Sequence, residues 1–357
     1  MKTLEDLNLE REKVLVRVDF NVSLNEKGEI LGDERIRMVL PTIDHLMEKG
    51  AKITLVSHLG RPKKREGRLS LAPVAKRLAE MSGYEVALFD IVSSTNVLLG
   101  RYNRRGRERG TLILLENLRF SEGEEKNDSD FVQMLAKFGR MFVQDAFSSC
   151  HKKHASIVGL PRILPSCSGL LMEKEVEKLS GVIKDPKRPF VVIMGGKKVD
   201  TKARAIESLL EIADELLVGE LIGKEIKENG IFLKHPEKLV APVDSVNGRD
   251  LGPQTIEIFK KKIRSAGTVF WNGPVGEFEK DSYCLGTKEI AKAVASSGYS
   301  VAGGGETMEA IKSLGLLNEI DHVSTGGGAT LEFLGRNGDL PGIWALRNSP
   351  SHNFGIE

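Results

Sequence analysis

Short apolar runs alternate with amphipathic stretches along the whole chain. The runs 14–18 and 190–194 are apolar at nearly every position, partly β-branched, and bounded by turn residues. Such runs are typical of strands buried on both faces, as in parallel sheets. Other stretches, such as 36–47 and 72–81, repeat apolar residues at spacings of three and four, which predicts helices. The steady alternation predicts an α/β fold with right-handed crossovers.

The same alternation organises the chain as two halves joined by a helix predicted over 173–180. Each half resembles a doubly wound domain, so we expect two Rossmann-like parallel-sheet domains separated by a cleft, over 1–165 and 166–339. The predicted strands cover 14–18, 52–57, 85–89, 111–115, 141–143, 190–194, 215–218, 239–242, 268–271, 299–302 and 322–324, with helices between most of them.

Polar residues follow the predicted strands at the end where doubly wound folds bind ligands. Several are cations, and arginine binds both phosphate and carboxylate through a bidentate fork. Taken singly, each residue fits a solvated surface position better, but as a group they favour a site for a small acid that carries a phosphate. In the first half they are Asp19, Asn21, Arg35, His58, Arg61, Arg119, Asp145, His151, Lys152 and His154.

Two other kinds of site are less favoured in this half. His151 and His154 have no carboxylate at ligand spacing, and the HExxH pattern is absent, so a metal site is not indicated. Residues 101–110 form a basic run with Tyr102 as their one aromatic residue and with Glu108 as an interruption. This composition is more typical of a solvated loop than of a nucleic-acid surface. Nucleic-acid binding stays open as an alternative, and it predicts retention on RNA that weakens with salt.

Three glycine-rich turns link strands to helices in the second half. Lys198 and Lys202 follow the first turn and stand four residues apart, on one face of the helix expected to begin there. Glu306 follows the second turn. Glycine N–H groups and helix N-termini bind phosphate oxygens, and a carboxylate suits Mg²⁺, so the combination predicts a polyphosphate nucleotide. The turns are Gly195-Gly196, Gly303-Gly304-Gly305 and Gly326-Gly327-Gly328.

Two common nucleotide motifs are absent. The pattern GxxxxGK[ST] does not occur, since its nearest relative at 219–224 has the wrong spacing and is followed by Glu225. No GxGxxG follows a predicted strand. A P-loop fold is therefore excluded, and a dinucleotide-binding fold has little support.

The composition indicates the general class of protein and its cellular compartment. Of 357 residues, 40% are hydrophobic and 29% charged, as in soluble globular proteins. No apolar run reaches ~18 residues, and the charged N-terminus lacks a signal-peptide core, so we expect no membrane contact. Three scattered cysteines suggest a reducing environment, so we expect a cytoplasmic protein. Residues 1–165 hold 28 Lys+Arg against 23 Asp+Glu, a net +5, and the remainder is at −3, which weakly favours an anionic ligand in the first half.

With both halves considered, the chain resembles the phosphoglycerate kinase family over most of its length. The resemblance is specific because many motifs occur together in the family's order. They are VRVDFNV (16–22), SHLGRP (57–62), LLENLRF (114–120), DAFSSCHKKHAS (145–156), LMEKE (171–175), GGKKVDTK (195–202), DLGPQT (250–255), WNGPVGEFE (271–279), GGGET (303–307) and STGGGATLEFL (324–334).

The resemblance implies reversible phosphoryl transfer between 1,3-bisphosphoglycerate and MgADP, by a monomer whose cleft closes over both ligands. It implies that residues 340–357 return to the first domain, and that Glu306 binds the nucleotide's Mg²⁺. The implied catalytic residues are Arg35, Lys198, Lys202, Gly304 and Gly327. The implied phosphoglycerate ligands are Asp19, Phe20, Asn21, Arg35, His58, Leu59, Gly60, Arg61, Arg119 and Lys152. The implied nucleotide ligands are Lys198, Lys202, Asn272, Glu279, Gly303, Gly304, Gly305, Glu306 and Thr307.

Four departures from the family pattern leave an alternative open. Lys152 stands where the family has an arginine, Glu306 replaces an aspartate, and Thr201 replaces an acid. The segment 215–224 lacks the family's Gly-Gly-x-Met-Ala, which contributes to the adenine pocket, so the nucleotide's base and its affinity stay open. The alternative hypothesis is a non-catalytic regulator that binds the nucleotide or the acid without turnover.

Overall fold

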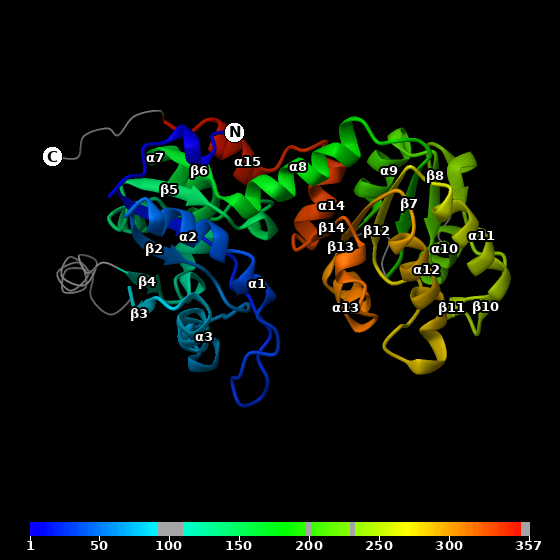
Figure 1. Cartoon of the computed structure of the whole chain (residues 1–357), viewed down its shortest axis with the longest axis horizontal. Coiled ribbons are helices and arrows are strands. Elements are labelled where there is room, and N and C mark those ends of the chain that lie inside the picture. The colour runs from blue at the N-terminus through cyan, green and yellow to red at the C-terminus, as the bar shows by residue number, and fades with distance from the viewer. Residues whose placement is uncertain (92–109, 197–201, 229–232, 351–357) are drawn as a thin grey trace. The chain divides into compact units, whose positions relative to one another are not determined.

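Two six-stranded parallel sheets organise the chain, which confirms the predicted α/β class (Figure 1). The computed structural model describes residues 1–91, 110–196, 202–228 and 233–350. The chain divides into two units, Met1–Lys174 with Leu340–Glu357, and Glu175–Asp339. The division falls within α8 (Leu170–Lys184), which is longer than the predicted 173–180.

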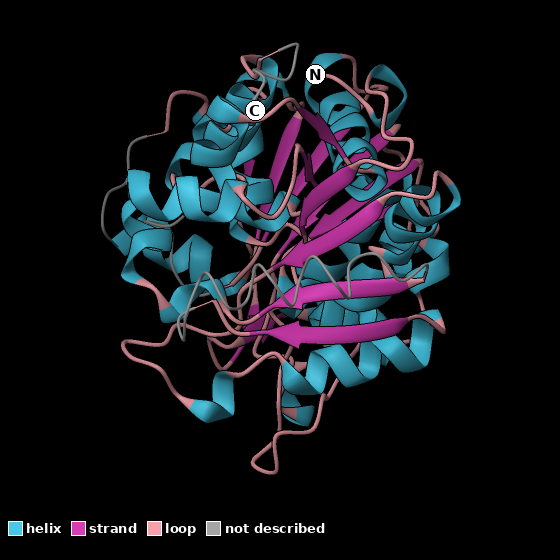
Figure 2. Cartoon of the chain, turned by 90° about the vertical axis from the view of Figure 1, so that its left-hand side faces the viewer, coloured by secondary structure: helices cyan, strands magenta, loops and turns pink. Residues whose placement is uncertain are grey.

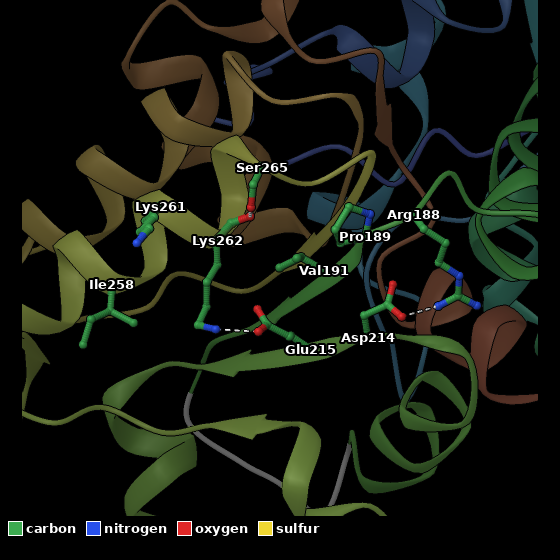
Figure 3. A pocket seen from close by; sticks show the side chains of 9 residues that line it. All are labelled: Arg188, Pro189, Val191, Asp214, Glu215, Ile258, Lys261, Lys262 and Ser265. Carbon is green, nitrogen blue, oxygen red and sulfur yellow. Dashed lines mark hydrogen bonds and ion pairs between the residues drawn. The ribbon is translucent and has the colours of Figure 1, made fainter.

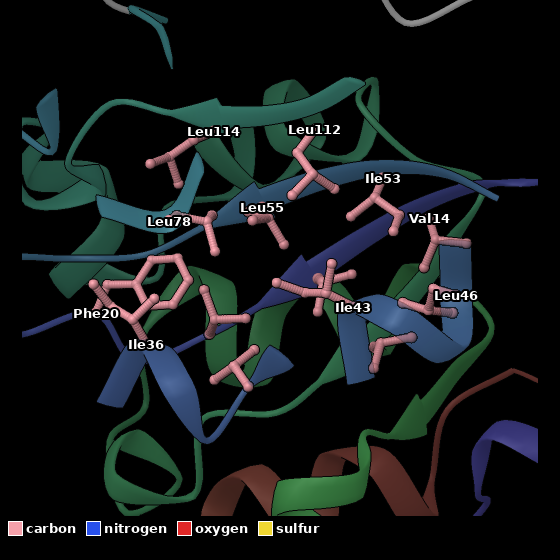
Figure 4. Packing of buried hydrophobic residues seen from close by; sticks show 14 of the residues in the cluster. Val14, Phe20, Ile36, Ile43, Leu46, Ile53, Leu55, Leu78, Leu112 and Leu114 are labelled. Atoms are coloured by element: carbon pink, nitrogen blue, oxygen red, sulfur yellow. The ribbon is translucent and has the colours of Figure 1, made fainter. Parts of the chain in front are cut away.

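The first sheet has the order β3-β4-β2-β1-β5-β6, and all of its pairs are parallel. Figure 2 shows its strands flanked by helices. Side chains alternate between its faces: Val14 and Val16 join one hydrophobic cluster, and Leu15 joins the other. Figure 4 shows Ile36 and Ile43 packed under these strands. The strands are β1 (Lys13–Arg17), β2 (Lys52–Val56), β3 (Glu85–Phe89), β4 (Thr111–Leu115), β5 (Met141–Gln144) and β6 (Ser166–Ser168).

The second sheet has the order β14-β13-β12-β7-β8-β9 and is also parallel throughout. Its two central strands are buried at every position, and one of them, β7 (Phe190–Met194), is wholly apolar, as expected for strands covered on both faces. Its strands are β7 (Phe190–Met194), β8 (Glu215–Val218), β9 (Leu239–Val240), β12 (Thr268–Asn272), β13 (Tyr299–Gly303) and β14 (His322–Ser324), and a separate hairpin pairs β10 (Ser245–Val246) with β11 (Asp250–Leu251).

Helices fill the connections. Local rules explain their ends: α3 has a proline in its first turn and ends at Gly83, which has a left-handed conformation. Within the described ranges, no helix is long and apolar enough to cross a membrane. The helices of the first unit are α1 (Glu34–Arg37), α2 (Leu40–Glu48), α3 (Ala72–Ser82), α5 (Glu122–Lys126), α6 (Ser129–Ala136), α7 (Leu160–Ile163) and α15 (Pro341–Arg347). Those of the second are α9 (Ala203–Ile212), α10 (Glu220–Glu228), α11 (Pro253–Arg264), α12 (Leu285–Ala295), α13 (Gly305–Ser313) and α14 (Gly328–Gly335).

Several predicted elements were wrong in detail. The single helix expected over 36–47 is interrupted between α1 and α2, where Pro41 lies in the first turn of α2 and has no N–H to continue a helix. The strand expected over 239–242 keeps only two residues. Strand β6 was not predicted because three residues give too short a pattern, although it completes the first sheet. The basic run 101–110 lies almost wholly outside the described residues.

Candidate active site

Both sheets reverse their strand order beside the first strand of the unit. Strand β1 lies between β2 and β5, and β7 lies between β8 and β12. From each of these strands the chain first builds one side of the sheet and then returns to the other. Such a switch point leaves a crevice beyond the carboxyl ends of the two strands, where ligands bind. The loops after β1 and β5, and after β7 and β12, are therefore the expected sites.

The loop after β1 is organised by the carboxylate of Asp19. Its Oδ1 accepts a hydrogen bond from the backbone N of Asn21 at 2.9 Å, and its Oδ2 accepts from Arg35 Nη1 and Ser148 Oγ. Ser148 lies in the loop after β5, so the contact joins the two sides of the switch point. Asp19 is mostly buried, whereas the Arg35 side chain is 28% exposed. The carboxylate thus holds a guanidinium that a ligand can still reach.

The loops after β1 and β2 are tied together by polar contacts. Asn21 Oδ1 accepts from Gly60 N at 2.8 Å, and Phe20 N donates to Ser57 Oγ at 2.9 Å. Arg119, from the loop after β4, donates from Nη1 to the Gly60 carbonyl at 2.7 Å. Gly60 has a φ of +65°, a left-handed conformation that favours glycine.

Arg119 is largely enclosed, and its Nε lies 3.2 Å from Glu125 Oε1. That approach is close enough for an ion pair, although its geometry does not make a hydrogen bond. Burial lowers the pKa of the Arg119 guanidinium, and the Glu125 charge opposes this shift.

Beneath these loops, Arg17 and His58 form a buried pair. Arg17 Nη2 lies 3.0 Å from His58 Nδ1, and since arginine can only donate, Nδ1 must accept and the histidine carries its proton on Nε2. The pKa of His58 is well below its ordinary 6.5, first because burial disfavours the charged ring and then because Arg17 is nearby. Burial also lowers the pKa of Arg17 to about 10, so it stays charged at neutral pH. His58 is therefore a neutral hydrogen-bond donor from Nε2.

Other residues predicted for this half lie apart from that cluster of contacts or have another role. Arg61 and Lys152 are exposed, and Leu59 is buried with its carbonyl bonded to Asn117 Nδ2 at 2.8 Å. Asp145 faces the protein: its Oδ1 accepts from Met172 N at 3.0 Å, in the first turn of α8. Placing Asp145 among the strand-end ligand groups was therefore wrong, because this carboxylate caps a helix. Burial raises its pKa to about 6.

In the second unit, the loops after β7 and β12 lie against each other through their backbones. Gly195 N donates to the Asn272 carbonyl at 2.9 Å, and Gly196 N donates to the Pro274 carbonyl at 2.8 Å. The backbone of Gly273 and Pro274 leaves no room for a Cβ at Gly195. Close backbone approach therefore requires glycine at this position.

Lys202 lies over this bare backbone. Its Nζ donates to the Gly195 carbonyl, and a Cβ added to Gly196 or Gly273 would come within 2.9 or 2.8 Å of that nitrogen. Burial lowers the pKa of Lys202 to about 8, an effect that the nearby Glu306 charge opposes. Helix α9 begins one residue later, with Lys202 as its N-cap. The predicted helical face shared by Lys202 and Lys198 was thus wrong for Lys202, and Lys198 lies outside the described residues.

Side-chain contacts join the loop after β12 to the second glycine turn. Asn272 Nδ2 donates to the Gly303 carbonyl at 2.7 Å, and Gly273 N donates to Thr307 Oγ1 at 2.7 Å. Gly304 caps α13 with a φ of +103°, which an L side chain rarely adopts. The first turn of α13 therefore presents its N–H groups beside the Lys202 loop.

The remaining predicted nucleotide residues are accessible. Glu306 is exposed in the first turn of α13, and Glu279 is exposed in the turn that follows β12. Gly305 and Gly327 have open space where a Cβ would stand, and Gly327 caps α14 with a φ of +53°. Ser324 Oγ and Thr330 Oγ1, 2.7 Å apart, fix the ends of this third turn.

A hollow of about 810 Å³ lies at the other end of the second sheet, before β7 and β8 (Figure 3). Two of the three cations that line it are paired: Arg188 Nη1 lies 2.9 Å from Asp214 Oδ1, and Lys262 contacts Glu215. None of the predicted site residues lines it. The converging polar groups, rather than this hollow, identify the candidate site.

Sequence reasoning missed the groups that support the ligand-facing residues. Arg17, Ser57, Ser148, Ser156 and Asn117 all lie inside the quoted motifs, but none was singled out. Arg17 offered the clearest indication, because a charged residue interrupts an otherwise apolar strand and must find partners when buried.

Comparison with known proteins agrees with this geometry. The family model described as phosphoglycerate kinase matches residues 4–231 and 228–337, and its two matches overlap at 228–231, where α10 ends. The chain is 42% identical to the phosphoglycerate kinase of Rubrobacter xylanophilus, covering 97% of this chain and 98% of the relative. It is 40% identical to that of Thermus thermophilus, covering 97% and 100%.

Solved structures give the same result. The phosphoglycerate kinase from Coxiella burnetii matches with a TM-score of 0.82 and 34% identity, covering 97% of this chain and 98% of that one. The enzyme from Pyrococcus horikoshii matches with a TM-score of 0.83 and 32% identity, over the same shares. From its sequence, its fold and the polar loops at its two switch points, this chain belongs to the phosphoglycerate kinase family.

Proposed function

We propose that the first unit binds the three-carbon acid and the second unit binds the nucleotide, in a reversible phosphoryl transfer between 1,3-bisphosphoglycerate and ADP that gives 3-phosphoglycerate and ATP. The family relationship makes the chain a phosphotransferase with a carboxyl group as acceptor. The observation that carries the division of labour is the chemistry of the two switch points. Arginines and a neutral histidine gather at one, and glycine turns with one lysine gather at the other.

The side chains of the first unit suit an acid with a phosphate. The guanidinium groups of Arg35 and Arg119 bind carboxylate or phosphate oxygens through paired N–H groups. His58 donates from Nε2 without adding charge, and Asn21 orients the loop that follows β2. Arg61 and the exposed Lys152 supply further positive charge, Lys152 as a point charge in place of the family's arginine. Asp19 holds Arg35 ready, so the guanidinium is ordered before the acid arrives.

The second unit supplies what phosphoryl transfer needs: positioning and neutralisation of charge, with no covalent nucleophile. Lys202 places an ammonium over the loop after β7, and Lys198, another lysine of the GGKKVDTK motif, binds the same phosphates. The N–H groups of Gly304 and Gly327, at the starts of α13 and α14, bind equatorial phosphate oxygens. Glu279 binds the ribose. Asn272, Gly303, Gly305 and Thr307 hold the loop that shapes the phosphate site.

The described residues fit an Mg²⁺ ion that arrives with the nucleotide. They contain no cluster of three or more His, Cys, Asp or Glu that could enclose a metal by itself. Mg²⁺ is commonly held by one or two carboxylates together with substrate phosphates. Glu306, exposed in the first turn of α13, provides such a carboxylate. When bound, the ion supplies charge neutralisation at the phosphates.

A coupled assay tests the proposal directly. Purified chain is given 3-phosphoglycerate and each of a panel of nucleoside triphosphates, with Mg²⁺, and product formation is followed. We expect turnover with ATP, and the panel also measures the base preference that segment 215–224 leaves open. Ligand-induced stabilisation without turnover at saturating substrate would instead support a non-catalytic binding protein.

A further inference from the structure

Glu124, in the short helix α5, is a carboxylate with no exposed surface below the acid-binding loops. Its Oε1 accepts from Ser156 Oγ at 2.6 Å, and its Oε2 accepts from Ser156 N at 3.0 Å. Ser156 belongs to η5 (Ala155–Gly159), a π-helical turn, an element that is often found at functional sites. The proposed phosphoryl transfer gives this carboxylate no role.

The same serine continues toward the substrate loops. Ser156 Oγ accepts from Arg17 Nε at 2.8 Å, and Arg17 Nη2 donates to His58 Nδ1 at 3.0 Å. The hydroxyl proton must point to Glu124, because arginine can only donate. Arg17, a pure donor, sets the proton of His58 on Nε2, and the carboxylate anchors Ser156, which in turn accepts from Arg17 and positions the guanidinium against His58.

Stability alone explains this arrangement poorly. Burying a carboxylate and a guanidinium costs more than a well-packed apolar pair of similar volume. Burial raises the pKa of Glu124, and the Arg17 charge is the main influence that opposes the rise. His154 Nδ1 lies 3.8 Å from Glu124 Oε1, and burial with the nearby Arg119 lowers the pKa of that histidine to about 4, so it stays neutral. Arg17 is thus the strongest lasting countercharge.

We propose that Glu124 is a positioning residue for the acid substrate: acting through Ser156 and Arg17, it holds His58 with its proton on Nε2, as a donor to the substrate. The inference rests on the proposed function, since it assigns His58 to the acid. Glu124 touches neither substrate nor nucleotide. Its effect should therefore appear in acid binding and in the state of the His58 ring, with nucleotide binding unchanged.

Glu124→Gln tests the proposal, because the amide keeps the shape but cannot accept both bonds from Ser156. We expect KM for 3-phosphoglycerate to rise ~10-fold, the scale of a hydrogen bond to a charged group, with KM for MgATP unchanged. Histidine ¹⁵N spectra, with His58 assigned from His58→Gln, should change from the pure Nε2–H tautomer to a mixture. Ser156→Ala should give the same two changes. Glu122→Gln, with an exposed side chain paired to Lys126, is the matched control and should change neither.

The two readouts separate the possible failures. If Glu124→Gln lowers only the melting temperature, with KM and the His58 tautomer unchanged, the carboxylate is merely structural and the inference is wrong. If it does not fold, Ser156→Ala decides by the same two measurements. If the unaltered chain has no turnover, the proposed function fails, and the tautomer of His58 in Glu124→Gln still decides whether the carboxylate controls this ring.

Discussion

In the proposed division of labour, the two switch points bind an anion in different ways. In the first unit, side chains do the work: Arg35, Arg119 and His58 each depend on a partner that orients it. In the second unit, the main chain does most of it, through glycine turns at the N-termini of α13 and α14, with Lys202 over the loop after β7. A small acid with a carboxylate and a phosphate must be distinguished by shape, which forks and donors achieve. A diphosphate is mainly charge and oxygen atoms, for which backbone N–H groups suffice.

The largest effect is expected from the one described cation of the glycine site. Lys202→Ala should reduce kcat by at least ~100-fold, the scale of losing one preorganised charge at the transition state. Turnover is measured in the coupled ATP assay. Lys261→Ala, an exposed lysine in α11 at the opposite end of the second sheet, serves as the control and should be unaffected. Near-normal turnover by Lys202→Ala would show that the Lys202 charge is not needed for phosphoryl transfer.

A smaller effect is expected when charge is kept but the fork is lost in the first unit. Arg35→Lys should lower kcat/KM for 3-phosphoglycerate by ~10-fold, because an ammonium cannot make the paired hydrogen bonds of a guanidinium. Steady-state kinetics with the acid varied measures the change. Arg37→Lys, a mostly exposed arginine in the same helix, is the control. An Arg35→Lys enzyme with unaltered kinetics would show that charge alone is needed there.

The acidity of Lys202 gives a pH prediction that separates the halves. Burial places its pKa at about 8 instead of its ordinary 10.5, so the free enzyme loses this charge above pH 8. We expect kcat/KM for MgADP to fall about fivefold between pH 8 and 9, as one group with that pKa loses its proton. Lys202→Arg should remove the fall.

The same shift affects stability with the opposite sign. The folded chain releases the Lys202 proton more readily than the unfolded chain does, so between pH 8 and 10.5 the unfolded state binds more protons. This residue therefore makes the free energy of unfolding rise with pH across that window, while activity falls. A Lys202→Met variant should lack that contribution. The free energy of unfolding is measured against pH for the unaltered chain and for Lys202→Met. If the two plots run parallel between pH 8 and 10.5, the shifted pKa is wrong.

The smallest effect tests the backbone itself. Gly304→Ala places a Cβ 3.0 Å from Asn272 Nδ2 at a φ of +103°, a strain of ~1–3 kcal/mol. We expect a lower melting temperature and weaker MgADP binding. Gly305→Ala, where a Cβ would meet open space, is the control and should change the melting temperature little. Equal effects of both substitutions would show that the conformation of Gly304 is not what matters.

The sequence predicted this contrast only in part. Apolar runs predicted most strands within a residue or two. The strand-end rule placed Asp19 at the first switch point, where it holds Arg35, and Gly304 at the end of β13, the neighbour of β12. Local patterns could not predict the series of buried hydrogen bonds that links Glu124 to His58, because its residues are far apart in sequence and meet only after folding. The same limit misassigned Asp145, whose strand-end position suited a ligand while its carboxylate caps α8.

Isothermal titration calorimetry with both ligands on both site variants tests the central contrast most directly. The account predicts that Arg35→Lys weakens binding of 3-phosphoglycerate and leaves MgADP binding unchanged, while Lys202→Ala weakens MgADP and leaves 3-phosphoglycerate unchanged. If each variant weakens both ligands equally, or if the pattern is reversed, the division between a side-chain site for the acid and a backbone site for the diphosphate is contradicted.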